Sequence, residues 1–245
     1  MITEDFELPL KPIEAEVVNP RNLIIFSKPK VGKTTLIQDL KNALLLDFEN
    51  GSDYIKAMKV KVSSIDDLKI IGKKIKEAKY PYEYIVVDTV TALEEKCIDY
   101  AEELYSSKPI GKDWFAEDGG KEKYGNILNL PKGAGYFWLR EAYTRVIDYI
   151  KTLAPNIILL GHVKDGELGK EGAEFNALDL DLTGKLKRMA SAKSDAIGYL
   201  YRKGNQNILS FITSDKVICG ARSPHLSNEQ IVLSEMQDDG SVKCY

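Results

Sequence analysis

The sequence is poor in cysteine, histidine and tryptophan, with three, two and two of these residues among 245. Cys97, Cys219 and Cys244 share no close spacing, which excludes a disulfide framework and a cysteine metal cluster. No apolar run approaches the length of a membrane span. The acidic start, residues 1–5, lacks the basic and apolar regions of a signal peptide. We therefore expect a cytoplasmic protein without a membrane partner.

The chain also lacks an excess of positive charge, because its formal net charge is −3. A nucleic-acid site must then be a local patch rather than the whole surface. The length of 245 residues suits one α/β domain, or one domain with insertions. We expect an arm at 1–15, a domain at 16–235 with an inserted loop at 106–135, and a C-terminal tail at 236–245.

What the sequence does contain is one specific motif at residues 27–34. It reads Ser27-Lys28-Pro29-Lys30-Val31-Gly32-Lys33-Thr34. An apolar run, 23–26, precedes it, and helical periodicity follows it from Lys33 to about Lys41. Strand, loop and helix in this order, with Gly-Lys-Thr at the end of the loop, match the phosphate-binding loop G-x-x-x-x-G-K-[ST]. The motif therefore predicts nucleotide binding.

The chemistry of this loop assigns its residues. Successive backbone N–H groups form an anion-binding nest, and the following helix adds its positive end. Lys33 would reach the β- and γ-phosphates, and the Thr34 hydroxyl would hold Mg²⁺. Ser27 stands where the pattern has its first glycine, and we expect this small residue to be a tolerated variant. The expected nucleotide contacts are Ser27, Lys28, Pro29, Lys30, Val31, Gly32, Lys33, Thr34 and Thr35.

Alternating strand and helix signals predict the fold. Continuous apolar runs typical of buried parallel strands recur at 43–46, 84–87 and 157–160. Helical spacing of apolar residues marks 65–78, 93–104 and 136–153, and a basic helix is expected at 183–193. Residues 196–201 and 208–214 flank Gly204-Asn205, which signals a hairpin, and 16–18 and 217–219 could add short strands. We predict a three-layer α/β P-loop NTPase fold with a mostly parallel sheet and a C-terminal β-hairpin.

Three polar residues each follow one of these apolar runs. Ligands of parallel sheets bind at the carboxyl ends of the strands. Asp88 would support Mg²⁺, or alternatively cap the next helix. Glu49, on the strand expected beside the phosphate-loop strand, would orient a water molecule, or alternatively be a solvated loop acid. His162 would contact the γ-phosphate, or alternatively be satisfied by local hydrogen bonds.

Taken together, these elements resemble the RecA-like ATPase core. Residues 44–49 look like the strand that carries the catalytic glutamate, 85–88 like the Walker B strand, and 158–162 like the sensor strand before a DNA-binding loop. The layout is most similar to small phage-encoded AAA- or RecA-type proteins linked to single-strand annealing and recombination. This resemblance implies ATP and Mg²⁺ as cofactors, single-stranded DNA as a partner, and a homo-oligomer with nucleotide held between neighbours. It implies catalytic roles for Lys33, Glu49, Asp88 and His162.

Two basic clusters are candidates for contact with DNA. In the inserted loop, lysines interleave with aromatic residues, which suits a single strand because bases stack on rings while lysines follow phosphates. The alternative is that the rings pack on the body and the lysines are solvated. The candidates are Lys112, Trp114, Lys121, Lys123 and Lys132 in the loop, with Lys185 and Arg188 in the second cluster. Arg222 is a candidate arginine finger for a neighbour's site, or a surface arginine.

Three other functions remain open from the sequence. A helicase, loader or packaging motor could use the same core. A small-molecule kinase usually needs a lid with arginines, and residues 106–135 contain none. A nucleotide-binding interaction protein with little hydrolysis would fit the serine at position 27.

Overall fold

A computed structural model describes residues 8, 10–111, 126–164, 178–237, 239 and 241–245. Its strands are β1 (Asn22–Ser27), β2 (Ala43–Asp47), β3 (Met58–Lys61), β4 (Tyr84–Asp88), β5 (Asn156–Lys164), β6 (Asp179–Leu180), β7 (Ala196–Lys203), β8 (Gln206–Ser210), β9 (Gly220–Ala221), β10 (Gln230–Met236) and β11 (Val242–Cys244). Its α-helices are α1 (Lys33–Ile37), α2 (Ile65–Glu77), α3 (Val90–Ser106), α4 (Ala134–Ile150) and α5 (Leu186–Ala192).

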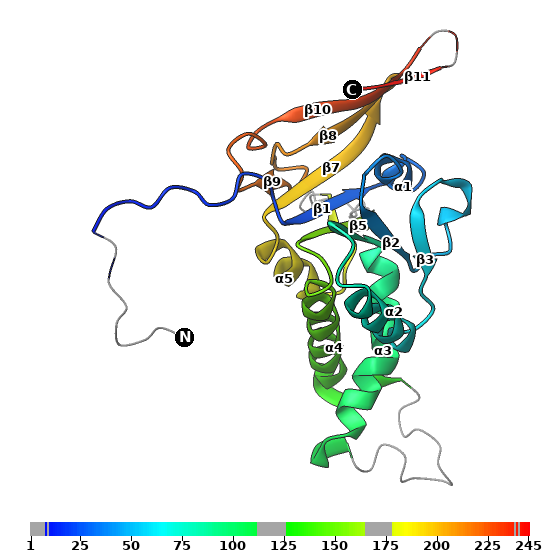
Figure 1. The fold of residues 1–245 in the computed structure, drawn as a ribbon. Helices are drawn as coiled ribbons and strands as arrows, with labels where there is room; N and C mark the ends of the chain where they lie inside the picture. Colours follow the sequence, from blue (N-terminus) through cyan, green and yellow to red (C-terminus); the bar gives the residue numbers. More distant parts are fainter. Residues whose placement is uncertain (1–7, 9, 112–125, 165–177, 238, 240) are drawn as a thin grey trace, which may run out of the picture.

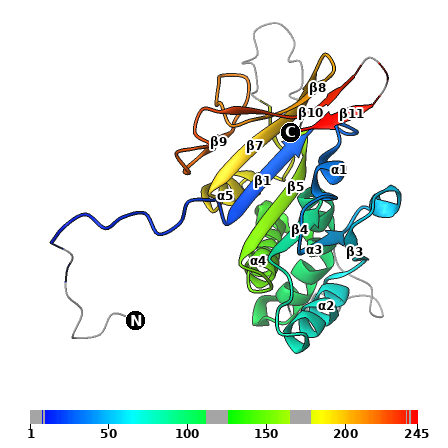
Figure 2. The same cartoon turned by 45° about the horizontal axis from the view of Figure 1, so that its top comes forward.

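The strands form one sheet with a parallel centre. Among the described residues its path is β11-β10-β8-β7-β1-β5-β4-β2-β3, and β6 and β9 pair with β5 and β7. The strands from β3 to β7 along this path pair in parallel, whereas β8, β10 and β11 are antiparallel. Figure 2 shows β7, β1 and β5 side by side, with the phosphate-loop strand β1 in the middle.

The central strands are apolar on both faces because helices cover both. Ile24 and Phe26 of β1 belong to one buried cluster, which side chains of α2, α3 and α4 complete. Ile25 of the same strand belongs to the second cluster, which Ile37 of α1 completes. Figure 1 shows α2, α3 and α4 gathered on one side of the sheet. These three layers confirm the predicted α/β P-loop NTPase fold.

The ends of the sheet also follow the sequence. The hairpin predicted around Gly204-Asn205 is confirmed, because β7 and β8 pair in antiparallel register from Tyr199↔Ser210 to Lys203↔Gln206. The sheet then continues beyond the expected hairpin. Residues 236–245, expected as a tail, include β11, which pairs with β10. Residues 217–219 form only isolated bridges, and the short strand β9 lies just after them.

Three expectations about elements were wrong. Residues 16–18 form no strand, and the described part of residues 8–19 is exposed (Figure 1). A strand needs a neighbouring strand to bond its backbone N–H and C=O groups, and no described strand pairs with this segment. The helix after the phosphate loop ends at Ile37 rather than Lys41. The Leu40 N–H bonds to the carbonyl of Ile37, three residues earlier, whereas an α-helix would bond it to the carbonyl four residues earlier. The basic helix is also shorter than 183–193 and covers Leu186–Ala192.

The expectation that β2 lies beside β1 was also wrong. β5 and β7 are the neighbours of β1, and β5 and β4 lie between β1 and β2. The strands enter the sheet in an order that the chain does not follow, because the helical crossovers are long enough to skip positions. Glu49, which follows β2, must therefore reach the centre of the sheet across β4.

Candidate nucleotide-binding site

The phosphate loop lies at the carboxyl end of β1, between the ends of β5 and β7. Ser27, the last residue of β1, is opposite His162 of β5 and Leu200 of β7. The loop then turns through two residues with positive φ, Lys30 at 64° and Gly32 at 104°. Gly32 also caps the start of α1 in the left-handed conformation, where glycine is favoured. The strained part of the turn thus lies at positions 30 and 32 rather than at Ser27.

Ser27 has a partner that glycine could not supply. Its side chain is fully buried, and its hydroxyl accepts a hydrogen bond from Lys33 Nζ at 3.1 Å. The same hydroxyl donates to the Lys28 carbonyl at 2.8 Å. The serine therefore holds the lysine ammonium at the base of the loop. That the departure from the glycine pattern leaves the site active remains a prediction.

Lys33 is buried although it carries a charge. Burial lowers the pKa of Lys33, and the nearby carboxylates of Asp88 and Glu49 oppose this shift. A buried ammonium lacks its water shell, so it binds strongly to any anion that enters the site. The phosphates of a nucleotide would provide that charge.

Thr34 and Asp88 bring two oxygen groups together. Thr34 Oγ1 donates a hydrogen bond to Asp88 Oδ2 at 2.8 Å, which links the first turn of α1 to the end of β4. Burial raises the pKa of Asp88, and the bond from Thr34 opposes this rise. A divalent cation would favour the ionised carboxylate, and hydroxyl and carboxylate oxygens are the ligands that Mg²⁺ prefers. The pair fits an Mg²⁺ held jointly with nucleotide phosphates.

Asp88 does not cap the next helix, which was its alternative role, because the neighbouring Thr89 is the cap. Thr89 is the N-cap of α3, and its side chain accepts a hydrogen bond from the Ala92 N–H at 3.3 Å. The Thr89 hydroxyl also donates to Glu49 Oε1. Sequence reasoning missed this residue, although threonine directly before an apolar helix is a known N-cap signal.

Asp47 is a second residue that sequence reasoning missed. It is 1% exposed, and it accepts hydrogen bonds from the backbone N–H groups of Glu49, Gly51 and Ser52 at 3.1, 3.3 and 3.0 Å. The Ser52 hydroxyl adds a fourth bond at 2.5 Å. Burial acts to raise the pKa of Asp47, but these bonds outweigh it and the net shift is downward. Asp47 thus fixes the loop that carries Glu49.

Glu49, His162 and Lys33 form a chain of contacts across the strand ends. His162 Nε2 lies 2.8 Å from Glu49 Oε1, and His162 Nδ1 lies 3.4 Å from Lys33 Nζ. An ammonium can only donate, so Nδ1 acts as the acceptor and the neutral imidazole carries its proton on Nε2, toward Glu49. Both contacts of Glu49 end on Oε1, and Oε2 accepts no hydrogen bond from the described residues. The arrangement can hold a water molecule at Oε2 and link it to the phosphate-binding lysine.

Comparison with known families gives the same assignment. The sequence model of a family described as "AAA domain" matches residues 19–223, which is more than half of the chain. The chain belongs to this AAA-domain family. No curated protein matches the chain. The family supports a P-loop AAA-type ATPase core that binds nucleotide.

The candidate DNA contacts of this AAA domain fall into two groups. Lys112, Trp114, Lys121 and Lys123 lie outside the described residues. The other candidates, Lys132, Lys185 and Arg188, are exposed, and Lys185 is the N-cap of α5.

Arg222 lies at the amino-terminal edge of the sheet, away from the phosphate loop. Its N–H donates to the Asp195 carbonyl, and the Asp195 N–H donates to the carbonyl of Asn22, the first residue of β1. Its guanidinium contacts the Ala192 carbonyl at 3.0 Å and the Asp195 carboxylate at 3.6 Å. A role as a finger in a neighbour's site therefore remains a prediction about an assembly.

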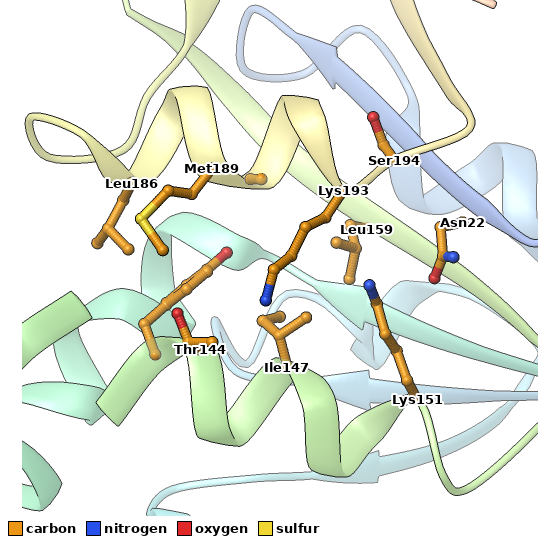
Figure 3. A pocket seen from close by; sticks show the side chains of 11 residues that line it. Asn22, Thr144, Ile147, Lys151, Leu159, Leu186, Met189, Lys193 and Ser194 are labelled. Atoms are coloured by element: carbon orange, nitrogen blue, oxygen red, sulfur yellow. The ribbon is translucent and has the colours of Figure 1, made fainter. Parts of the chain in front are cut away.

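The AAA domain also has a cavity that is separate from the nucleotide site. It lies between α4 and α5, where Lys151, Lys193 and Met189 line it (Figure 3). Its lining is mostly apolar, and it includes Tyr143, whose buried hydroxyl has no hydrogen-bond partner among the described residues. None of the predicted site residues lines this cavity. Among the described helices, none is both long and apolar enough to cross a membrane.

Proposed function

We propose that this AAA domain is an Mg²⁺-dependent ATPase that acts on single-stranded DNA in recombination, annealing or repair. One observation carries the hydrolytic part of the proposal. Four strand ends bring together a set of five side chains, in which Lys33 contacts His162, His162 contacts Glu49, and Thr34 contacts Asp88. This set contains a phosphate-binding cation, an oxygen pair suited to Mg²⁺ and a carboxylate base.

The proposed reaction is attack of water on the γ-phosphorus of ATP. Glu49 Oε2 takes a proton from the water as the new P–O bond forms, and the bond to the β-phosphate oxygen breaks to give ADP and phosphate. Lys33 compensates the negative charge on the phosphate oxygens. His162 holds Glu49 at Oε1 and keeps its carboxylate aimed at the water. Mg²⁺, held by Thr34 and Asp88, would supply further positive charge to the β- and γ-phosphates.

The start of α3 supports coupling between this site and a DNA surface. Thr89, its N-cap, donates to Glu49 in the site. Thr91 Oγ1 donates to the Asp181 carbonyl at 3.1 Å, and the Glu94 carboxylate accepts the Thr183 N–H at 3.0 and 3.2 Å. A single turn and a half of helix thus touches both the catalytic carboxylate and the segment that leads into the basic helix α5. We infer that nucleotide state and DNA binding influence each other through this contact.

The test is phosphate release from ATP with and without Mg²⁺ and with and without single-stranded DNA. We expect hydrolysis that requires Mg²⁺, rises with DNA and disappears in Lys33→Ala. Hydrolysis at the same rate with and without DNA would refute the coupling and leave an ATPase that does not respond to DNA. A strand-unwinding assay tests the motor alternative, and phosphate transfer to nucleoside monophosphates tests the kinase alternative.

A further inference from the structure

The geometry points to the groove between the start of α4 and the turn before α5 as the seat of single-stranded DNA, an inference that rests on the proposed function. The groove is lined on one side by Tyr136 and Arg140 of α4, and on the other by Thr183, Gly184 and Lys185. Its empty volume is about 860 Å³, including the part open to solvent. The groove brings together two cations, Arg140 and Lys185, that lie 45 residues apart in the sequence.

The described lining of the groove is positively charged and not neutralised. No acidic residue is among the described residues that line it. Arg140 and Lys185 in the groove, and Lys132 and Arg188 beside it, form no ion pair or hydrogen bond with the described part of the chain. By contrast, Lys187 on the same helix pairs with Asp179 at 3.0 Å. Cations without partners on an acidic protein mark this groove as a local site for an anion.

Exposed rings decide which kind of anion fits. Tyr136, which lines the groove, is 42% exposed, and its neighbour Phe137 is 49% exposed. Both stand on the first turn of α4, next to the unpaired cations. Single-stranded nucleic acid uses this combination, because bases stack on aromatic rings while the phosphates follow arginine and lysine. A duplex hides the faces of its bases and could use only the charges.

The groove is also tied to the nucleotide site. The Thr183 N–H, at its rim, donates to Glu94, which is 7% exposed and lies about one and a half turns after Thr89. Thr89 in turn contacts Glu49. Single-stranded DNA bound in the groove would therefore act on the start of α3, which also positions the catalytic carboxylate.

The experiment measures anisotropy of a labelled oligo-dT of about 20 nucleotides bound to the full chain, with Mg²⁺ and a non-hydrolysable ATP analogue, over a range of salt. The test variant is Arg140→Ala with Lys185→Ala. The matched control is Lys187→Ala with Lys193→Ala, which removes the same charge from two lysines that are already ion-paired. Thermal unfolding checks that each variant folds.

Two lost phosphate contacts should lower the slope of log affinity against log salt by about 1.4, which is roughly 25-fold in affinity at 0.1 M salt. Tyr136→Ala should weaken binding about fivefold or more. If the test variant binds like the wild type, or the control falls equally, the groove is refuted while the proposed function stands. If the wild-type chain binds no single-stranded DNA, the DNA part of the proposed function fails, and the groove fails with it.

Discussion

Replacing Glu49 with glutamine isolates the proposed proton transfer from every other role of the side chain. The amide keeps the size of the side chain and an oxygen that can accept from Thr89 and His162, the two contacts of Oε1. It cannot take a proton from water. No hydrogen bond joins Glu49 to residues 27–35 in the described chain, so nucleotide affinity should change little.

The expected loss follows from the ordinary size of base catalysis. A positioned general base contributes about 10²- to 10⁴-fold, or ~2.7–5.4 kcal/mol of activation free energy. We therefore expect the turnover number of Glu49→Gln to fall at least about a hundredfold. The dissociation constant for ATP should stay within about threefold, or about 0.7 kcal/mol, because Glu49 forms no hydrogen bond with residues 27–35 in the described chain. Phosphate release at saturating ATP gives the first quantity, and titration calorimetry gives the second.

A carboxylate in the same loop provides the control. Asp53 pairs with Lys61 at 3.0 Å, and both side chains are at least half exposed. Asp53→Asn makes the same chemical change four residues away and should leave turnover unchanged. If Glu49→Gln retained more than about a tenth of wild-type turnover, Glu49 would not be the base, because that loss is smaller than base catalysis supplies.

Three further predictions follow from other contacts. Thr34→Ala should weaken ATP binding in Mg²⁺ about tenfold or more. Thr34→Ser keeps the hydroxyl bonded to Asp88 and should restore the affinity. Equal affinities of Thr34→Ala and the wild type in calorimetry would contradict the metal role. Burial raises the pKa of Glu94. At a pH just above the ordinary pKa of glutamate, the folded state therefore keeps a proton on Glu94 that the unfolded state has lost. The free energy of unfolding falls as the pH rises through that window. Urea unfolding of Glu94→Gln should show a weaker fall over this window, and an identical pH dependence would refute the assignment. Tyr143→Phe should raise the free energy of unfolding by about 1 kcal/mol because it removes a buried hydroxyl without a partner; lower stability would mean that the hydroxyl is hydrogen-bonded in solution.

The parts of the fold that could be predicted are those with local causes. The loop at 27–34 can be recognised in the sequence because phosphate binding needs glycine, lysine and threonine at fixed spacing. The strands β2, β4 and β5 are visible because strands buried on both faces are continuously apolar. The hairpin of β7 and β8 is visible because its turn is Gly-Asn.

The order of the strands could not be read in the same way. The runs of β2, β4 and β5 are all short and apolar, and nothing in them states which neighbour each one takes. The prediction placed Glu49 beside the phosphate loop for this reason. The site still forms, because His162 bridges the distance between Glu49 and Lys33.

The supporting residues of the site were hidden for a related reason. Asp47 looks like one of several loop acids, and its role appears only when the chain at 49–52 folds back over it. Thr89 contacts a carboxylate forty positions earlier in the chain. Arg140 has no motif around it, and it becomes a candidate contact for DNA only when α4 and α5 pack side by side. Each of these roles depends on tertiary contacts that sequence spacing does not encode.

The most direct test of the account is the affinity of the wild-type chain for single-stranded DNA in two nucleotide states. The same labelled oligo-dT is titrated with Mg²⁺ and a non-hydrolysable ATP analogue, and then with Mg²⁺ and ADP. The account predicts that the ATP-like state binds DNA at least about fivefold more tightly, because the triphosphate and the DNA act on the two ends of the first turns of α3. Equal affinity in the two states would contradict it, since a ligand that does not distinguish two states cannot be coupled to them.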